Sequence, residues 1–158
     1  MCMKDSLIQN TLKKIESGTE IGTRIEHIIP SLAMYQEVIN SLEENDVISI
    51  LDVGCNYGYG TYHLSMGVKN AKVLGVDIDN EILKRARRTF KAPNLSFDSA
   101  DFTDRESVLK LVEREETYDV IVCFEVFEHI ENDKTKLFME NLLKTLKPNG
   151  VLFISTPT

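Results

Sequence analysis

Hydrophobic and polar positions along this chain follow two different periods. Short, nearly continuous apolar runs are typical of buried parallel strands, and apolar residues at every third or fourth position are typical of amphipathic helices. The runs predict strands over 47–51, 71–76, 118–123 and 151–155, and a short third strand is expected over 94–98. The helical spacing predicts helices over 4–17, 30–42, 61–66, 82–90, 104–116 and 137–146, with a connector over 18–30 and a turn over 147–150.

Helices separate the predicted strands, which is typical of an α/β domain built on a parallel sheet. We expect an N-terminal helical segment, 1–46, and a core, 47–158. Ligands of such sheets bind beyond the carboxyl ends of the strands. Acidic residues follow the first four strands at that end: Asp52, Asp77, Asp101 and Glu125. A single crevice at this edge is the simplest interpretation.

In the stretch 47–60, a predicted apolar strand is followed by a turn that contains Gly54, Gly58 and Gly60. Glycine accepts positive φ and has no Cβ to keep a ligand away from the main chain, and the next helix begins with unpaired N–H groups. Such a turn alone fits either a nucleotide-like cofactor or a merely tight connection. Asp77 lies 19 residues after Gly58. Nucleotide-binding βαβ units have a ribose-binding acid at about this distance.

The composition limits the classes of partner that the chain is expected to bind. The chain has 25 acidic residues against 18 Lys and Arg, a formal charge of -7, which disfavours extended nucleic acid. Its apolar runs are far shorter than the ~20 residues of a membrane span, and a signal-peptide core is lacking, so we expect a cytoplasmic protein without a membrane partner.

The cysteines, Cys2, Cys55 and Cys123, have no disulfide or C-x-x-C spacing. We interpret them as reduced thiols, with Cys55 and Cys123 as buried apolar residues and not nucleophiles.

Five segments in series give the chain a specific resemblance from about residue 47 onward. They are 51–58 (LDVGCNYG), 75–79 (GVDID), 100–102 (ADF), 118–122 (YDVIV) and 146–152 (LKPNGVL). In this order they resemble the motifs of class I S-adenosylmethionine-dependent methyltransferases. The resemblance implies S-adenosylmethionine as cofactor and a Rossmann-like, doubly wound, mainly parallel sheet of strand order 3-2-1-4-5.

The sequence departs from that family in two respects. Asn56 and Asn149 stand where the family commonly has glycine, and both turns are still expected because Asn tolerates the left-handed conformation. The given sequence ends before the helix and antiparallel strand pair that the family adds after its fifth strand, so we expect either a shortened chain or a minimal sheet. The sheet edge then needs a cover, for which an oligomer is one candidate.

The resemblance implies roles for the first motif. Asp52 would orient the glycine turn and meet the cofactor's amino group through water. Gly54 and Gly58 would leave room for the methionine and ribose portions. Cys55 and Asn56, in the same turn, complete this part of the predicted cofactor site.

The later motifs would contact the nucleoside and the sulfur. Asp77 would hold the ribose hydroxyls, and Ile78 would lie against the adenine. Asp101 and Phe102 would contact the adenine amine and ring. Phe124 would border the sulfonium through its backbone.

The segment after the fourth predicted strand carries Glu125, Glu128 and His129. On a helix this spacing places the three on one side, as a metal site or a general base requires. A similar Glu-x-x-Glu-His occurs in quinone-biosynthesis O-methyltransferases and in magnesium-dependent RNA 2′-O-methyltransferases, although the latter also use a downstream histidine that is lacking here. We predict Glu128 and His129 as catalytic and assign no metal. The alternative is that both only cap the crevice.

The favoured function is S-adenosylmethionine-dependent O-methylation of a small molecule. A non-catalytic cofactor-binding or interaction module is the first alternative. An RNA 2′-O-methyltransferase and a dehydrogenase are weaker alternatives, because the charge is acidic and the later motifs fit methyl transfer better.

Overall fold

The computed structural model describes residues 3–17, 25–42, 47, 49–114 and 117–156. Its helices are α1 (Met3–Ser17), α2 (Ile25–Ser41), α3 (Tyr59–Gly67), α4 (Asn80–Thr89), α5 (Arg105–Arg114) and α6 (Thr135–Thr145), with a short 3₁₀ helix η1 (Phe127–His129). Its strands are β1 (Ser49–Val53), β2 (Lys72–Asp77), β3 (Leu95–Ser99), β4 (Tyr118–Cys123) and β5 (Leu146–Ile154).

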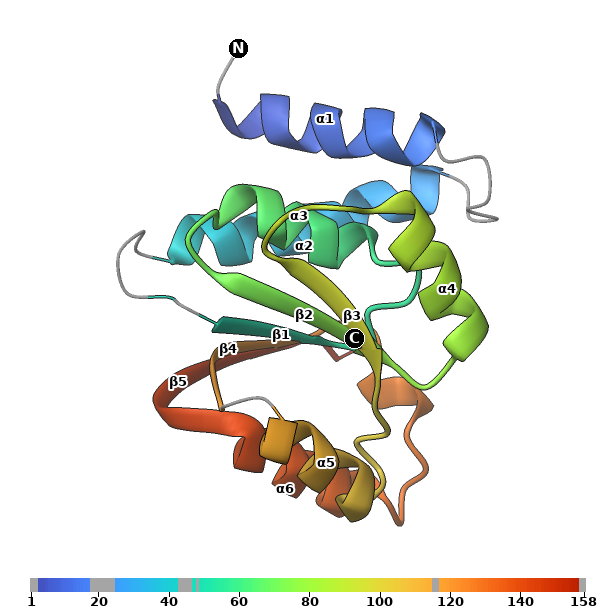
Figure 1. The fold of residues 1–158 in the computed structure, drawn as a ribbon, viewed down its shortest axis with the longest axis vertical. Coiled ribbons are helices and arrows are strands. Elements are labelled where there is room, and N and C mark those ends of the chain that lie inside the picture. The colour runs from blue at the N-terminus through green and yellow to red at the C-terminus, as the bar shows by residue number, and fades with distance from the viewer. Residues whose placement is uncertain (1–2, 18–24, 43–46, 48, 115–116, 157–158) are drawn as a thin grey trace.

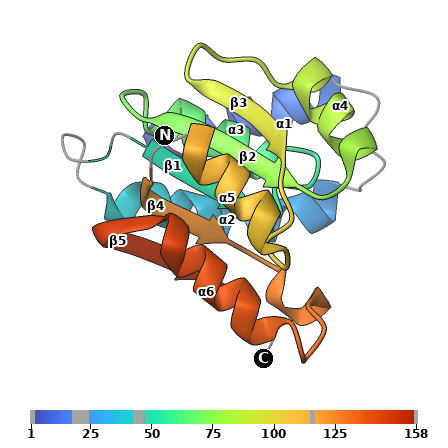
Figure 2. The ribbon, with the colours of Figure 1, turned by 60° about the horizontal axis from the view of Figure 1, so that its bottom comes forward.

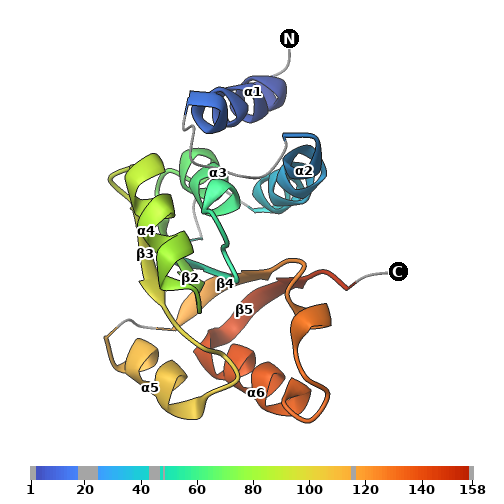
Figure 3. The ribbon, with the colours of Figure 1, turned by 90° about the vertical axis from the view of Figure 1, so that its right-hand side faces the viewer.

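The strands form one parallel sheet in the order β3-β2-β1-β4-β5. This order confirms the predicted Rossmann-like fold. Helices α1 to α4 cover one face of the sheet, with α1 outermost, and α5 and α6 cover the other (Figures 1 and 3). Because β1 is the central strand, its carboxyl end opens between those of β2 and β4.

The apolar run of β1 is buried on both faces of the sheet. Ile50 and Leu51 are both fully buried. Ile50 joins a cluster with Tyr35 and Val38 of α2, whereas Leu51 joins a cluster with Phe138 of α6. Successive strand side chains point to opposite faces, so a continuous apolar run is what a sheet covered on both sides requires.

Helix α2 begins earlier than predicted. The sequence placed residues up to Pro30 in a connector, but α2 starts at Ile25 and Pro30 lies inside it. The prediction was wrong because proline weakens a helix without always ending it, and tertiary packing overrides that preference. Here Ile28 and Leu32, on either side of Pro30, are fully buried in a cluster with Leu83 of α4.

A buried histidine joins the N-terminal helices to α3. His63 is fully buried, with Nδ1 2.8 Å from Oγ1 of Thr11 on α1 and Nε2 2.9 Å from Oε1 of Gln36 on α2. Burial lowers the pKa of His63 to about 4, so the ring is neutral at neutral pH.

The predicted boundary between an N-terminal helical segment, 1–46, and a core, 47–158, stays a prediction.

The predicted turn over 147–150 forms an irregularity within β5. Tyr118 pairs with Leu146 and Val120 pairs with Val151, so the intervening residues of β5 bulge out of register. Asn149 has φ 66°, which confirms the expected left-handed conformation. Beyond the bulge β5 is an edge strand in the described part of the chain (Figure 2). The predicted oligomeric cover of this edge stays a prediction.

None of the helices in the described ranges is long and apolar enough to cross a membrane. The cytoplasmic location stays a prediction.

Candidate functional site

The turn after β1 is held open by its backbone conformation. Gly54, Asn56 and Gly58 have φ of 74°, 51° and 84°, so Asn56 adopts the left-handed conformation that we expected of it. The N–H groups of Gly54 and Cys55 both donate to the carbonyl of Val76, at 2.8 and 2.9 Å. These bonds tie the turn to the end of β2, where Asp77 follows.

The missing side chains of the glycines make room for protein atoms. A Cβ on Gly54 would overlap Cγ2 of Val126, and a Cβ on Gly58 would lie 2.7 Å from Cζ of Phe97. The sequence predicted that these glycines leave room for the cofactor. The structure shows that both positions already need glycine to fit against Val126 and Phe97 within the protein.

Asp52 lies beneath the turn and is fully buried. Its Oδ1 accepts a hydrogen bond from the hydroxyl of Tyr35 at 3.0 Å, and its Oδ2 accepts one from Thr61 at 2.6 Å. Burial raises the pKa of Asp52 to about 6, although the hydrogen bonds from Thr61 and Tyr35 oppose this shift. The role predicted for Asp52, to orient the turn and meet the cofactor's amino group, stays a prediction.

Asp77 and Ile78 lie beside this turn. Oδ2 of Asp77 accepts the N–H of Asn56 at 2.9 Å, and Oδ1 accepts the N–H of Asp79 at 3.1 Å. Each carboxylate oxygen retains a further lone pair, so Asp77 can still accept from hydroxyls. Ile78 is 70% exposed, an apolar surface of the kind on which a planar base stacks.

Asp101 and Phe102 follow β3 and differ in accessibility. Oδ1 of Asp101 accepts the N–H and the hydroxyl of Thr103, at 2.8 and 2.7 Å, and the residue is half-buried. The ring of Phe102 is only 3% exposed and lies 6.3 Å from that of Phe138, edge to face. This ring belongs to the core, so its predicted contact with adenine lacks an open surface.

The loop after β4 does not have the helical geometry that the sequence suggested. Glu125 has φ 55° and precedes η1, which spans only three residues. The positive φ breaks the helical path before Glu128, so the helical-spacing interpretation was wrong. The N–H of Glu125 donates to Oγ of Ser155 at 2.7 Å, which fixes this loop to the end of β5.

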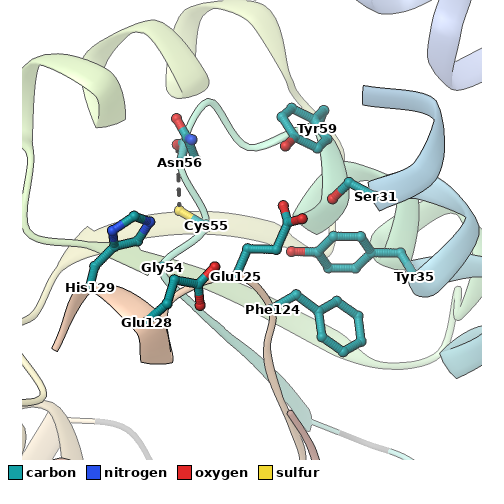
Figure 4. Close-up of a pocket in the computed structure, with 10 residues that line it drawn as sticks. All are labelled: Ser31, Tyr35, Gly54, Cys55, Asn56, Tyr59, Phe124, Glu125, Glu128 and His129. Carbon is teal, nitrogen blue, oxygen red and sulfur yellow. Dashed lines mark hydrogen bonds between the residues drawn. The ribbon is translucent and has the colours of Figure 1, made fainter. Parts of the chain in front are cut away.

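The turn after β1, the helices α2 and α3 and the loop after β4 enclose a pocket of about 320 Å³. Figure 4 shows Glu128 and His129 on one side of it and the Glu125 carboxylate pointing toward the hydroxyl-bearing side chains of α2 and α3. Its lining residues are Ser31, Tyr35, Gly54, Cys55, Asn56, Tyr59, Phe124, Glu125, Glu128 and His129. The other predicted cofactor residues lie outside its lining: Asp52, Gly58, Asp77, Ile78, Asp101 and Phe102. Within the described ranges no group of three His, Cys, Asp or Glu residues could hold a metal ion.

The pocket includes residues that the sequence interpretation missed. Ser31, Tyr35 and Tyr59 line it, but Tyr35 was assigned only to an apolar helix face. A buried tyrosine usually needs a partner for its hydroxyl, and this was the available signal. Cys55 and Cys123 are free and buried, as predicted. Burial raises the pKa of both thiols, that of Cys123 to about 12, which does not favour a nucleophile.

A protein-family model described as "Methyltransferase domain" matches residues 50–150. The chain belongs to this family. The match confirms the predicted membership of the class I S-adenosylmethionine-dependent methyltransferases, because the sheet order agrees as well.

Named relatives agree with this assignment. The chain is 28% identical to the ubiquinone biosynthesis O-methyltransferase of Rickettsia conorii, over 87% of the chain and 43% of that protein. It is 35% identical to the enzyme of the same name from Histophilus somni, over 84% of the chain and 53% of that protein. The chain thus spans about half the length of these relatives.

A solved structure is similar at the level of the fold and the sequence. Coclaurine N-methyltransferase, bound to N-methylheliamine and S-adenosylhomocysteine, matches with a TM-score of 0.63 and 28% identity. The match covers 85% of this chain and 38% of that one.

Proposed function

We propose that this chain binds S-adenosylmethionine in the pocket and transfers its methyl group to a hydroxyl oxygen of a small molecule. The observation that carries the proposal is that one cavity is lined by both Gly54 of the glycine turn and His129 of the loop after β4. The relatives named O-methyltransferases and the N-methyltransferase structure with bound S-adenosylhomocysteine support the cofactor.

The residues divide the work between binding and proton transfer. Asp77 and Ile78 would hold the ribose and the adenine, with Asp101 at the adenine amine and the Phe124 backbone at the sulfur. S-adenosylmethionine, when bound, supplies a methyl group on a cationic sulfur, which is a good leaving group. His129, exposed in the pocket, would take the hydroxyl proton as the acceptor oxygen forms its bond to carbon, and Glu128 beside it would stabilise the charged imidazole.

The charge of the pocket favours a neutral or cationic acceptor. Among the described residues, its lining includes Glu125 and Glu128 but neither Lys nor Arg. A carboxylate or phosphate on the acceptor would be repelled at close range. A phenol or an alcohol suits this lining.

The proposal is tested by binding and turnover on the same samples. Calorimetry with S-adenosylhomocysteine measures binding, and methyl transfer is assayed with a catechol, a secondary amine and a short RNA. His129→Ala is compared with His27→Ala, which removes an exposed histidine of α2 outside the pocket lining. We expect both variants to bind like the wild type and His129→Ala alone to lose about 100-fold in transfer to the catechol.

The other outcomes separate the alternatives. A wild-type chain that binds no S-adenosylhomocysteine contradicts the proposal. Binding without transfer to any acceptor supports a non-catalytic module. Transfer to the RNA or the amine in place of the catechol replaces the proposed acceptor class.

A further inference from the structure

The N-terminal helix α2 contributes a side chain to the centre of the cofactor turn. Tyr35 is 5% exposed, and its hydroxyl donates to Oδ1 of the fully buried Asp52 at 3.0 Å. Asp52 is followed at once by Val53 and Gly54, so its position sets where the turn starts. A residue of the N-terminal segment thus holds the first acid of the predicted cofactor motif.

The ring of Tyr35 also contacts the elements on either side of the pocket. A Cβ on Gly60 would overlap the ring, so the first turn of α3 lies directly against it. The ring meets that of Phe124 edge to face, with centroids 5.1 Å apart and an angle of 73° between planes. Tyr35 therefore packs α2 against the start of α3 and the end of β4.

We propose that Tyr35 is a positioning residue that holds the Asp52 carboxylate in its charged form beneath the glycine turn and so links the N-terminal helices to cofactor binding. This inference rests on the proposed function for its ligand. A charged carboxylate at this place attracts the ammonium group that S-adenosylmethionine and S-adenosylhomocysteine carry, and this attraction is stronger in a buried site than in water.

Because Asp52 ionises near neutral pH, a role of Tyr35 toward its carboxylate should depend on pH, whereas a role in packing alone should not. Asp52 has a pKa of about 6 in the folded chain against 3.8 for the free side chain, because burial raises it and the charge of Asp77 raises it further. Its contribution to folding is therefore greatest below pH 3.8 and is lost as the pH rises through 6.

Cys55, Tyr59 and Cys123 also face this carboxylate, and burial raises the pKa of each of them, so they stay uncharged at neutral pH. The hydrogen bonds from Thr61 and Tyr35 stabilise the charged form of Asp52, so removing either raises its pKa further.

The decisive variant is Tyr35→Phe, which keeps the ring and removes the hydroxyl. We expect its affinity for S-adenosylhomocysteine to fall about threefold at pH 8, because the carboxylate loses the hydrogen bond that positions it, and about tenfold at pH 6.5, because the further raised pKa also leaves fewer charged carboxylates at the lower pH. Calorimetric titration at both pH values measures this. Thr61→Val removes the other partner of Asp52 and should widen the loss at pH 6.5 in the same way.

Tyr62→Phe is the matched control. Its ring stacks on that of Phe90, 5.0 Å away, and it is not among the pocket residues, so its affinity should stay at the wild-type value at both pH values. A Tyr35→Phe affinity equal to that of the wild type, or a loss equal at both pH values, overturns the proposal. The second result would mean that Tyr35 only packs.

Thermal unfolding tests the link between Tyr35 and Asp52 without a ligand. Tyr35→Phe should lower the Tm by about 6 °C at pH 8 and by only about 2 °C at pH 5, because a hydrogen bond to a charged acceptor is worth more than one to a neutral acceptor. Equal losses at both pH values would overturn the link. If the wild type binds no S-adenosylhomocysteine, the proposed function fails, and this comparison still decides the role of Tyr35 toward Asp52.

Discussion

The two walls of the pocket hold their polar groups in different ways. The turn wall, made by Gly54, Cys55 and Asn56, is fixed within the protein, since Asp52 and Asp77 flank it and both oxygens of each carboxylate accept hydrogen bonds. The loop wall, made by Glu125, Glu128 and His129, is exposed. Groups that are fixed in advance lower the cost of ordering on binding. We therefore expect cofactor affinity to depend on the turn wall and turnover to depend on the loop wall.

The strongest test of this division is Gly54→Ala. We expect the affinity for S-adenosylhomocysteine to fall about 100-fold or more and the free energy of unfolding to fall by about 2–3 kcal/mol, because alanine is strained at positive φ and its Cβ overlaps Val126. Calorimetry and urea unfolding measure the two losses. The double variant Gly54→Ala with Val126→Ala removes the overlap and should recover part of the stability. An affinity within threefold of the wild type would show that the turn wall is not rigid.

A smaller effect is expected when one of two neighbouring acids is removed. Asp77→Ala should weaken S-adenosylhomocysteine binding about 30-fold, because it removes both the proposed ribose acceptor and the bond to the N–H of Asn56. Asp79→Ala is the control. Asp79 caps α4 by accepting the N–H groups of Glu81 and Ile82, so its loss should cost about 1 kcal/mol of stability and leave binding unchanged. Equal binding losses in the two variants would argue against a specific role for Asp77.

The smallest effect is expected for Asn56→Gly. Asn56 already adopts φ 51°, and its N–H, which glycine retains, makes the bond to Asp77. We expect the affinity for S-adenosylhomocysteine to stay within about twofold and the stability to change by less than about 1 kcal/mol. The same calorimetric and urea measurements check this. A larger loss of affinity would mean that the Asn56 side chain itself contacts the cofactor.

The sequence by itself determined the parts of this protein that depend on local pattern. The alternation of strand and helix patterns predicted the parallel sheet, and the apolar runs predicted its inner strands, because a strand covered on both faces must be apolar throughout. The position of Asp77 at the carboxyl end of its parallel strand predicted its place beside the turn. The tolerance of Asn for positive φ predicted the conformations of Asn56 and Asn149.

Only the tertiary structure decided which distant side chains meet at the site. In the sequence Tyr35 counts only as one residue of an apolar helix face. The fold places its hydroxyl against Asp52, 17 positions away, and so shows the hydrogen bond between them. The same packing put the Phe102 ring into the core and gave Glu125 a positive φ where helical spacing was expected. The physical reason is that side-chain partners and loop conformations depend on contacts between elements far apart in the chain, whereas periodicity and turn preferences act within a few residues.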